Sequence, residues 1–395
     1  MISKLAVSSE AWGPALSQSA SFLRGHSGFV FCGYPDADAL GSMLSLALYL
    51  KELGKRVYIV WPGPLIGKTD FLEDILRHNR VPLLGTAERI REYSEKVDAL
   101  VVCDTANRKL VPLYKELKQH ILAKETPVLE IDHHFGTDSE PVHPDGLHLF
   151  REANSTTEIA AEVLEAYAKA DSEAPDPFKR RNILVSLLTG LIADTGGGNV
   201  SIRPEDYDFW VKRLGDRLTE KTRRGRVDTD QDVPHFSSPE DIKEFLVKLS
   251  DSERQGVERL QEEIVHENGV GVLNLLDATR SRVEASLQLS AAAWAQILET
   301  MANAIPEVAG RVGMVYFHDK TAEGEDCYFI KLRRAQESAI DLRETESDIR
   351  SAFEDGAVLG GGGHPNAVSY RVRLIPEDQF LKSVEKLTKT LRESF

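Results

Sequence analysis

Short apolar runs alternate with longer amphipathic stretches in the first half of the chain. Four of these runs have the length of a buried strand and lie at residues 28–33, 57–60, 98–103 and 128–131. The stretch that begins at Ala39 instead repeats apolar side chains every three or four residues, which is the spacing of one helix face. This alternation predicts an α/β fold, a doubly wound and mainly parallel sheet with helices on both faces.

The composition changes after residue 213. Residues 214–254 include a basic cluster at 222–226 and a polar stretch at 227–239 that contains two prolines. This composition is typical of a linker or an exposed excursion. Pro239 has the position of the first residue of a new helix.

A second domain is predicted after this segment. Apolar runs at 270–276, 313–317 and 327–332 have the length of strands, and residues 289–304 have the spacing of a helix. We therefore expect a smaller α+β domain. The expected boundaries are 1–213 for the first domain, 214–254 for the linker and 255–395 for the second domain.

Acidic side chains follow the apolar runs. A single acid at such a position is usually a helix cap or a turn residue, but several of them together favour a functional site. Because open α/β sheets place their chemistry at the carboxyl ends of their strands, we expect these side chains to meet at one edge. They are Asp36 and Asp38 after the first run, Asp104 after the third, Asp132, His133 and His134 at the end of the fourth, and Asp194 after the apolar stretch 182–193.

Carboxylates and imidazoles gathered at one place indicate a metal site. This combination suits Mn²⁺ or Mg²⁺ better than the thiolate-rich surroundings of many zinc sites. Three carboxylates from separate strands would have strongly raised pKa values unless cations neutralised them. A pair of divalent ions can activate water and clamp an in-line phosphoryl displacement.

Two further segments have the composition of anion-binding sites. Ser155, followed three residues later by Glu158, resembles a capping box, and a phosphate contact by Ser155 and Thr156 is an equally good interpretation. Four glycines precede His364 and permit a backbone approach that side chains would block. This loop favours a cradle for a phosphate or a carboxylate.

The net charge limits the class of partner. The chain has 63 acidic and 48 basic residues and a formal charge of −15. This charge argues against binding of duplex DNA but is compatible with binding of a short nucleotide in a locally positive groove.

The three cysteines form no CxxC pair, which fits a reducing setting. The chain starts without a signal-peptide pattern and has no apolar run of membrane-spanning length. We therefore expect a cytoplasmic protein with no membrane partner.

Four ordered motifs resemble those of the DHH phosphoesterase superfamily. They are PDADALGS at 35–42, DTA at 104–106, DHH at 132–134 and TGLIADTG at 189–196. The GGGH at 361–364 resembles the signature of the DHH-associated C-terminal domain. Within the superfamily, the chain is most similar to the stand-alone nanoRNase/pAp-phosphatase type.

The resemblance implies roles for these residues. It implies two Mn²⁺ ions, with Mg²⁺ or Co²⁺ as alternatives, and Asp104 as the ligand that bridges them. Asp132 would orient a neighbouring imidazole, His134 would face the scissile phosphate, and the second domain would bind the rest of the substrate. The implied ligands are Asp36 and Asp104 for one ion, and Asp38, Asp104, His133 and Asp194 for the other. The implied substrate contacts of the second domain are Arg333, Gly361, Gly362, Gly363 and His364.

Two positions depart from the family pattern. Cys32 occupies the place of a histidine that usually binds the first metal. It could bind a softer metal, leave the site to water or be a buried thiol, and an altered first metal site is favoured over a loss of function. Gly198 occupies a place where an aromatic residue is common, which predicts a wider pocket.

The resemblance implies an enzyme that acts on phosphoric ester bonds. Its expected substrates are short oligoribonucleotides or dinucleotides such as pApA, cleaved to mononucleotides, with pAp as a further one. Alternatives within the superfamily are hydrolysis of cyclic dinucleotides, of polyphosphate or of pyrophosphate. An alternative of another class is a catalytically weakened nucleotide-binding protein. Oligomeric state is left open, with a homodimer among the alternatives.

Overall fold

The computed structural model describes residues 4–63, 65, 68–136, 139–223, 235–321 and 325–394. The chain divides into two compact units. The first consists of Met1–His134 and Ser139–Leu246, and the second of Phe135–Asp138 and Val247–Phe395. Each unit has its own sheet and its own apolar core.

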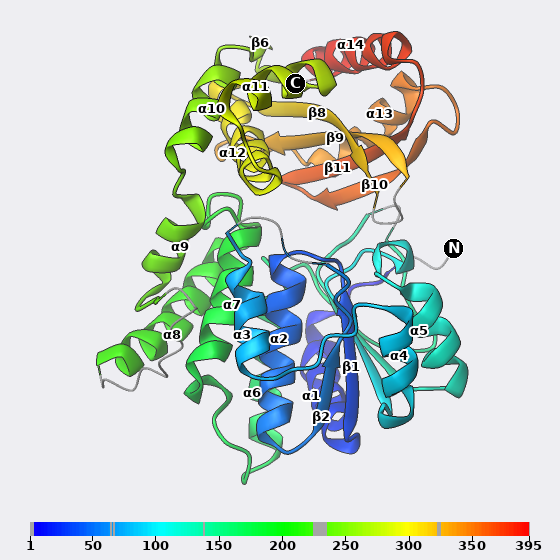
Figure 1. The fold of residues 1–395 in the computed structure, drawn as a ribbon, viewed down its shortest axis with the longest axis vertical. Helices are drawn as coiled ribbons and strands as arrows, with labels where there is room; N and C mark the ends of the chain where they lie inside the picture. Colours follow the sequence, from blue (N-terminus) through cyan, green and yellow to red (C-terminus); the bar gives the residue numbers. More distant parts are fainter. Residues whose placement is uncertain are drawn as a thin grey trace. The chain divides into compact units, whose positions relative to one another are not determined.

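A five-stranded sheet lies at the centre of the first unit (Figure 1). Its strands are β1 (Gly28–Gly33), β2 (Arg56–Ile59), β3 (Ala99–Cys103), β4 (Val128–Asp132) and β5 (Leu147–Phe150). Their order is β2-β1-β3-β4-β5, and every neighbouring pair is parallel. The structure therefore confirms the mainly parallel sheet and adds β5, a short strand that the apolar pattern did not predict.

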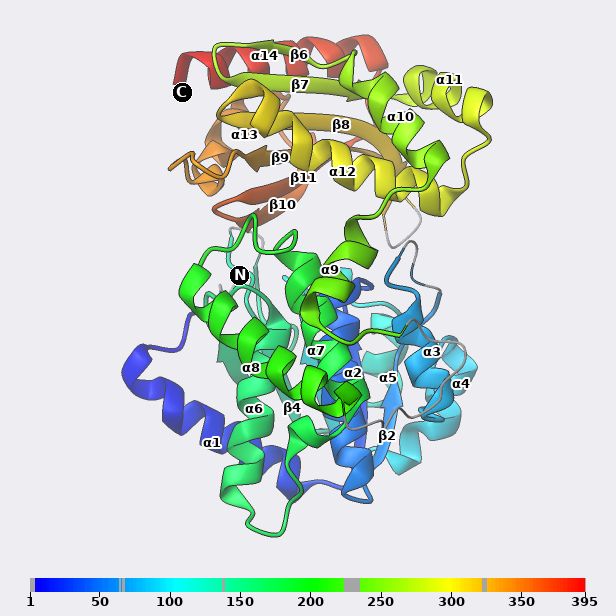
Figure 2. The same ribbon diagram turned by 90° about the vertical axis from the view of Figure 1, so that its left-hand side faces the viewer.

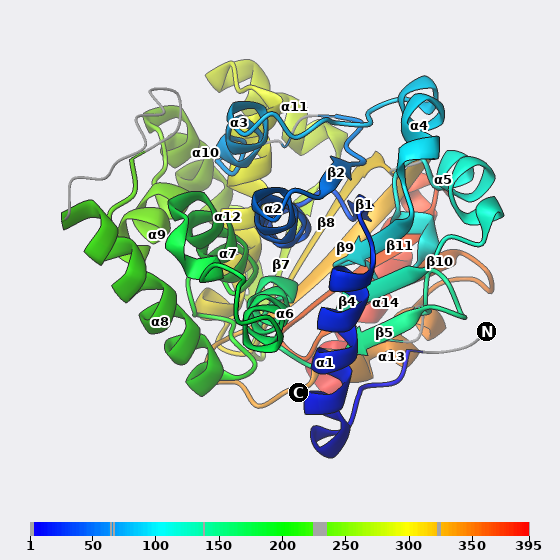
Figure 3. The ribbon, with the colours of Figure 1, turned by 90° about the horizontal axis from the view of Figure 1, so that it is seen from below.

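Helices cover both faces of this sheet, with α1, α2 and α6 on one side of the strands and α4 and α5 on the other (Figure 3). Phe29 and Phe31 of β1 belong to the core on the first face, whereas Val30 and Cys32 belong to the core on the second. The helices of this unit are α1 (Ser9–Gly25), α2 (Ala37–Glu52), α3 (Phe71–His78), α4 (Ala87–Tyr93), α5 (Tyr114–His120), α6 (Thr156–Ala170), α7 (Arg181–Asp194), α8 (Pro204–Arg223) and α9 (Pro239–Val247). Short 3₁₀ turns lie at Ser94–Lys96, Arg108–Leu110, Leu122–Lys124 and Pro177–Lys179.

The apolar stretch before Asp194 is the helix α7. It packs against α2, α6 and α8, so apolar residues surround nearly its whole circumference. A helix buried in this way shows no polar face in its sequence. Asp194 therefore lies at the carboxyl end of a helix, in contrast to the acids that follow strands.

The second unit contains a six-stranded sheet of order β10-β11-β9-β8-β7-β6, in which only β7 and β8 pair in parallel. Helices α10 to α12 contribute to the core on one face and α13 and α14 to the core on the other (Figure 2). The strands are β6 (Val265–Glu267), β7 (Val270–Leu275), β8 (Val312–Lys320), β9 (Asp326–Arg334), β10 (Val358–His364) and β11 (Ala367–Arg373). The helices are α10 (Asp251–Gln261), α11 (Asp277–Leu287), α12 (Ala291–Ala309), α13 (Glu346–Ala352) and α14 (Glu377–Ser394), with a 3₁₀ turn at Leu342–Thr345.

The glycine-rich segment before His364 is part of strand β10 and not the loop that the sequence predicted. Its glycines allow close pairing with β11, because a Cβ on Gly361 would lie 2.5 Å from the carbonyl oxygen of Ser369. A Cβ on Gly363 would likewise collide with the carbonyl oxygen of Ala367. Gly361 and Gly363 thus permit the pairing of β10 with β11 at the edge of the sheet.

The predicted linker contains regular structure where it is described. Helix α8 extends to Arg223, and α9 begins at Pro239 as the sequence predicted. Residues 224–234, which include most of the expected polar excursion, lie outside the described residues. The expected boundaries at 213 and 254 stay a prediction, and the division into compact units falls between Leu246 and Val247.

Candidate metal centre

The carboxyl ends of the central strands bring the predicted acids to one edge of the first sheet. Asp36 caps α2 just beyond β1, Asp104 directly follows β3, and Asp132 is the last residue of β4. Asp104 has a left-handed backbone with φ of 54°. Non-glycine residues rarely adopt this conformation, and it is common at functional sites.

Three carboxylates lie close to the imidazole of His133. The Nε2 atom of His133 lies 3.3 Å from Asp104 Oδ1, 3.6 Å from Asp194 Oδ2 and 3.7 Å from Asp38 Oδ2. The side chains of His133, Asp38 and Asp104 are almost fully buried, and that of Asp194 is 29% exposed. Four residues from four separate segments therefore offer ligand atoms to the same small volume.

The orientation of His133 suits metal binding. Its Nδ1 atom lies 3.0 Å from the carbonyl oxygen of Ala153. Because a carbonyl only accepts hydrogen bonds, Nδ1 carries the proton and Nε2 faces the carboxylates. Fixing the tautomer through the second ring nitrogen is the usual arrangement around metal-binding histidines.

The start of helix α6 holds the Asp38 carboxylate. The backbone amides of Thr156 and Thr157 donate to its two oxygens at 2.6 and 2.9 Å. The hydroxyl of Thr156 donates to Asp104 Oδ1 at 2.8 Å. The amide groups at a helix N-terminus stabilise an anion, so α6 positions two of the acids.

The structure confirms the capping interpretation of Ser155. Its hydroxyl accepts a hydrogen bond from the amide of Glu158 at 3.2 Å. The Glu158 carboxylate departs from the capping-box pattern, because it accepts from the amide of Asn154. Ser155 and Thr156 are both fully buried. Their contact with a substrate stays a prediction.

The charges of this cluster shift several pKa values. Burial, and then the neighbouring charge of Asp104, raise the pKa of Asp36 and of Asp38 well above the usual range. Burial also acts to raise the pKa of Asp104, but the imidazoles of His134 and His133 hold it well below the usual range. Although burial and His134 oppose it, the hydrogen bond to Asp104 and the charge of Asp194 raise the pKa of His133 to about 9. Acids that compete for protons in this way are well suited to share divalent cations.

His134 is held by a different carboxylate. Its Nδ1 atom lies 2.9 Å from Asp132 Oδ1 and 3.4 Å from Asp104 Oδ1. The other oxygen of Asp132 pairs with the ammonium group of Lys4. Asp132 thus contacts the second histidine of the pair, and Lys4 is a residue that sequence reasoning missed.

Comparison with known proteins agrees with this arrangement. Residues 28–191 match the DHH family, N-terminal domain. This segment is therefore similar to the N-terminal domain of the DHH family. The matched residues include Asp36, Asp38, Asp104 and the Asp132–His134 element, while Asp194 lies just beyond them.

Solved structures show the same fold over most of the chain. An exopolyphosphatase-related protein from Bacteroides fragilis is 17% identical, with a TM-score of 0.65, and the match covers 96% of this chain and 97% of that one. RecJ from Thermus thermophilus in complex with Mn²⁺ is 16% identical, with a TM-score of 0.51 and coverage of 96% and 55%. The DHH domain of a member of the s1p family of ribosomal proteins is 14% identical, with a TM-score of 0.52 and coverage of 98% and 93%.

Cys32 lies in the core of the first unit. It is fully buried among apolar residues on the face that α4 and α5 cover. Burial, and then the charge of Glu130, raise the pKa of its thiol far above the ordinary value. A thiol that is hard to ionise is a poor metal ligand. In the described part of the chain, Cys32 is absent from the groups whose ligand atoms lie within 4.8 Å of one another.

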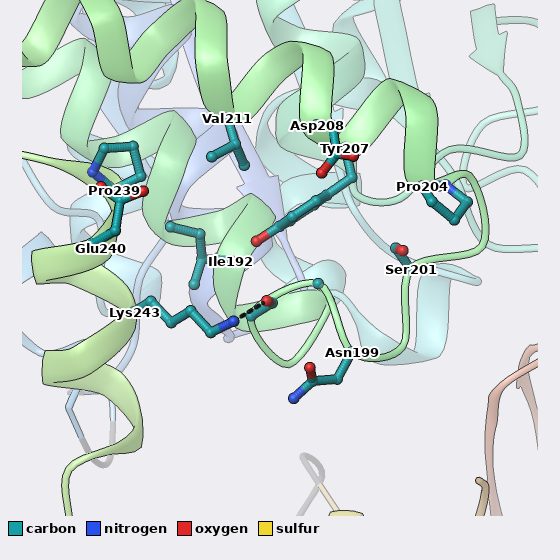
Figure 4. Close-up of a pocket in the computed structure, with 12 residues that line it drawn as sticks. Ile192, Asn199, Ser201, Pro204, Tyr207, Asp208, Val211, Pro239, Glu240 and Lys243 are labelled. Atoms are coloured by element: carbon teal, nitrogen blue, oxygen red, sulfur yellow. Dashed lines mark hydrogen bonds between the residues drawn. The ribbon is translucent and has the colours of Figure 1, made fainter. Parts of the chain in front are cut away.

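Gly198 lines a pocket of about 400 Å³ beside the turn that follows Asp194 (Figure 4). The ring of Tyr207, from α8, fills the space next to it, because a Cβ on Gly198 would lie 2.7 Å from that ring. The glycine also has φ of 93°. On the opposite side, Lys243 donates to the carbonyl oxygen of Gly197 at 2.7 Å (Figure 4). An aromatic ring thus reaches this turn from another helix.

The predicted substrate residues of the second unit lie on neighbouring strands. Arg333 of β9 pairs with Ala367 of β11, which in turn pairs with His364 of β10. Lys331, two residues before Arg333, lies on the same face of β9. The carboxylate of Glu299 lies 4.0 Å from both cations. Binding of a substrate by these residues stays a prediction.

None of the helices in the described part of the chain has the length and apolarity that a membrane crossing requires.

Proposed function

We propose that this chain is a divalent-metal-dependent phosphoesterase that hydrolyses short oligoribonucleotides to mononucleotides, with pAp as a further substrate. The observation that carries the proposal is the convergence of Asp38, Asp104 and Asp194 on His133 Nε2 within 3.7 Å. Carboxylates so close together and so buried are stable as anions only beside cations. Their hard oxygen atoms and one imidazole fit Mn²⁺ or Mg²⁺.

The ligands divide between two ions in this proposal. Asp38, Asp104, His133 and Asp194 would hold one ion, and Asp36 and Asp104 would hold the other. Bound divalent ions supply Lewis-acid activation of water and charge neutralisation at a phosphoryl group. No thiolate is needed, because Cys32 is buried in apolar surroundings.

The chain's own groups keep the ligands in place. The first turn of α6 holds Asp38, and the carbonyl group of Ala153 fixes the tautomer of His133. Asp132 holds the ring of His134 at 2.9 Å, and His134 would face the scissile phosphate. A preorganised arrangement of this kind lowers the cost of binding charge in the transition state.

Cationic side chains on one face of the second sheet favour a phosphate-bearing substrate. Lys331, Arg333 and Arg371 lie on the face of the sheet that also carries Ser369 and His364. Two guanidinium groups, one ammonium group and a bare glycine strand suit phosphates and a nucleobase. The chain's charge of −15 disfavours a long polyanion, which fits short oligonucleotides.

The test is release of AMP from pApA with Mn²⁺ and with EDTA in place of Mn²⁺. The proposal predicts metal-dependent release, and a panel of pAp, longer oligoribonucleotides, cyclic di-AMP and polyphosphate then ranks the substrates. Binding of pApA without cleavage would support the nucleotide-binding alternative. Hydrolysis of polyphosphate alone would replace the oligoribonucleotide substrate with an inorganic one.

A further inference from the structure

Lys4 is a lysine buried inside the first unit. Its side chain is only 1% exposed, which is rare for lysine unless it is paired. The ammonium group binds Asp132 Oδ2 and donates to the carbonyl oxygen of Thr105 at 2.5 Å. It also lies 4.8 Å from the centre of the Phe150 ring. The charge of Lys4 is therefore enclosed between the ends of β3, β4 and β5.

The partners of Lys4 belong to the metal centre. Asp132 Oδ1 holds His134 Nδ1 at 2.9 Å, while Asp132 Oδ2 faces Lys4. Thr105 directly follows Asp104, so the same ammonium group also contacts the backbone that carries the central acid. The two oxygens of one carboxylate thus connect the N-terminal segment to the second histidine.

The segment around Lys4 is well anchored. The amide of Lys4 donates to the carbonyl oxygen of Ser139, and that of Val7 donates to the carbonyl oxygen of Phe150. The following helix, α1, packs against α6, where the Trp12 ring nitrogen donates to Glu162 at 2.6 Å. A lysine carried by such a segment reaches Asp132 without a large entropic cost.

We propose that Lys4 is a positioning residue of the metal centre, which holds the Asp132 carboxylate so that Asp132 holds the His134 ring in one orientation. Without the ammonium group, the buried Asp132 carboxylate still has the His134 imidazole as a cationic partner. The carboxylate is then free to rotate toward another donor. The His134 ring then samples several orientations. The kinetic part of this inference rests on the proposed function.

The experiment compares Lys4→Met with Lys4→Arg and a matched control, Lys55→Met. Lys55 anchors the other end of α1, because its ammonium group donates to the carbonyl oxygens of Leu23, Arg24 and His26, and these partners lie outside the site. The measurements are kcat and KM for pApA with Mn²⁺, the Kd for Mn²⁺, the Tm, and the ¹⁵N resonances of the His134 ring. A His134→Gln variant assigns those resonances.

We expect Lys4→Met to lower kcat about 10- to 100-fold, the range found when a group that orients a metal-site residue is removed. KM and the Kd for Mn²⁺ should stay close to those of the wild type, and the His134 ring resonances should shift. Lys4→Arg should recover part of kcat. Lys55→Met should lower the Tm but leave kcat and the His134 resonances unchanged.

Unchanged His134 resonances and unchanged kcat in Lys4→Met, with only a lower Tm, would overturn the inference and leave Lys4 a structural anchor. If Lys4→Met does not fold, Lys4→Gln provides the same comparison, because it removes the charge and keeps a donor. If the wild type does not cleave pApA, the proposed function fails, while the His134 resonances still decide the role of Lys4.

Discussion

The backbone amide of Thr156 donates a hydrogen bond to the Asp38 carboxylate at 2.6 Å, across 118 positions of sequence. This contact joins the start of α6 to the first turn of α2. It exists because α2, α6 and α7 approach one another closely at glycines. At Gly190 of α7, a Cβ would lie 2.9 Å from Asp38 Oδ1 and would collide with the Thr157 methyl group.

Gly190→Ala should therefore damage both stability and metal binding. The added methyl group overpacks the junction, at a cost of about 1–3 kcal/mol, and displaces the Asp38 carboxylate. Thermal unfolding and a Mn²⁺ titration measure the two effects. Gly25→Ala is the control, because nothing lies within 4 Å of its added Cβ in α1. Equal Mn²⁺ affinity in the two variants would contradict the role of this junction.

Asp104→Asn should lower both activity and stability. The change keeps the shape but removes the charge that both ions are proposed to share, and several kcal/mol of transition-state stabilisation corresponds to a loss of at least about 100-fold in kcat. In EDTA the Tm should fall, because the imidazoles of His134 and His133 hold the pKa of Asp104 well below its usual range, so the charge of Asp104 stabilises the folded protein at neutral pH.

The control for Asp104→Asn is Asp145→Asn, an exposed position outside the site. It should leave kcat and Tm unchanged. Near-normal turnover in Asp104→Asn would show that Asp104 is not a shared ligand.

Metal binding should release protons and tighten with rising pH. In the metal-free protein the pKa of His133 is raised to about 9 from the ordinary 6.5, so its imidazole is protonated at neutral pH. A metal ion needs the neutral imidazole and must displace that proton, which predicts about a tenfold gain in affinity per pH unit below pH 9 and a plateau above it. Calorimetry in buffers of different ionisation enthalpy measures the protons released. Affinity that is independent of pH between 7 and 9 would argue against His133 as a ligand.

Arg333→Ala should weaken substrate binding more than chemistry. Arg333 lies on the cationic face of the second sheet, so its loss should raise KM for pApA about tenfold, the equivalent of one charge-assisted hydrogen bond, while kcat changes little. Steady-state kinetics measures both values. Arg350→Ala removes an exposed arginine of α13 and should change neither. An unchanged KM in Arg333→Ala would remove this residue from the substrate site.

The sequence predicted the parts of the fold that have continuous apolar patterns. The strands β1 to β4 are buried almost throughout, so apolar residues dominate them, although Arg56 begins β2 and Glu130 lies inside β4. Strand β5 was not predicted, because it has only four residues and begins with the half-buried Leu147 and His148. The glycines of β10 predicted a loop, since their strand conformation depends on the backbone of β11.

The acids of the site could be predicted because each follows an apolar run or lies in an ordered motif. Lys4 could not, because a single lysine near residue 1 belongs to no periodic pattern, and its burial depends on the ends of three strands that the chain reaches much later. The hydrogen bonds from the amides of Thr156 and Thr157 to Asp38 could not be predicted either, since the sequence does not show which backbone amides contact a side chain.

The central claim is that the carboxylates around His133 bind divalent metal ions, and crystals grown with Mn²⁺ test it most directly. Anomalous difference maps recorded at the manganese absorption edge should show peaks within about 2.5 Å of Asp38, Asp104, His133 and Asp194, the distance of a hard cation from its ligand atoms. Manganese peaks elsewhere, with none at this cluster in Mn²⁺-saturated crystals, would contradict the account.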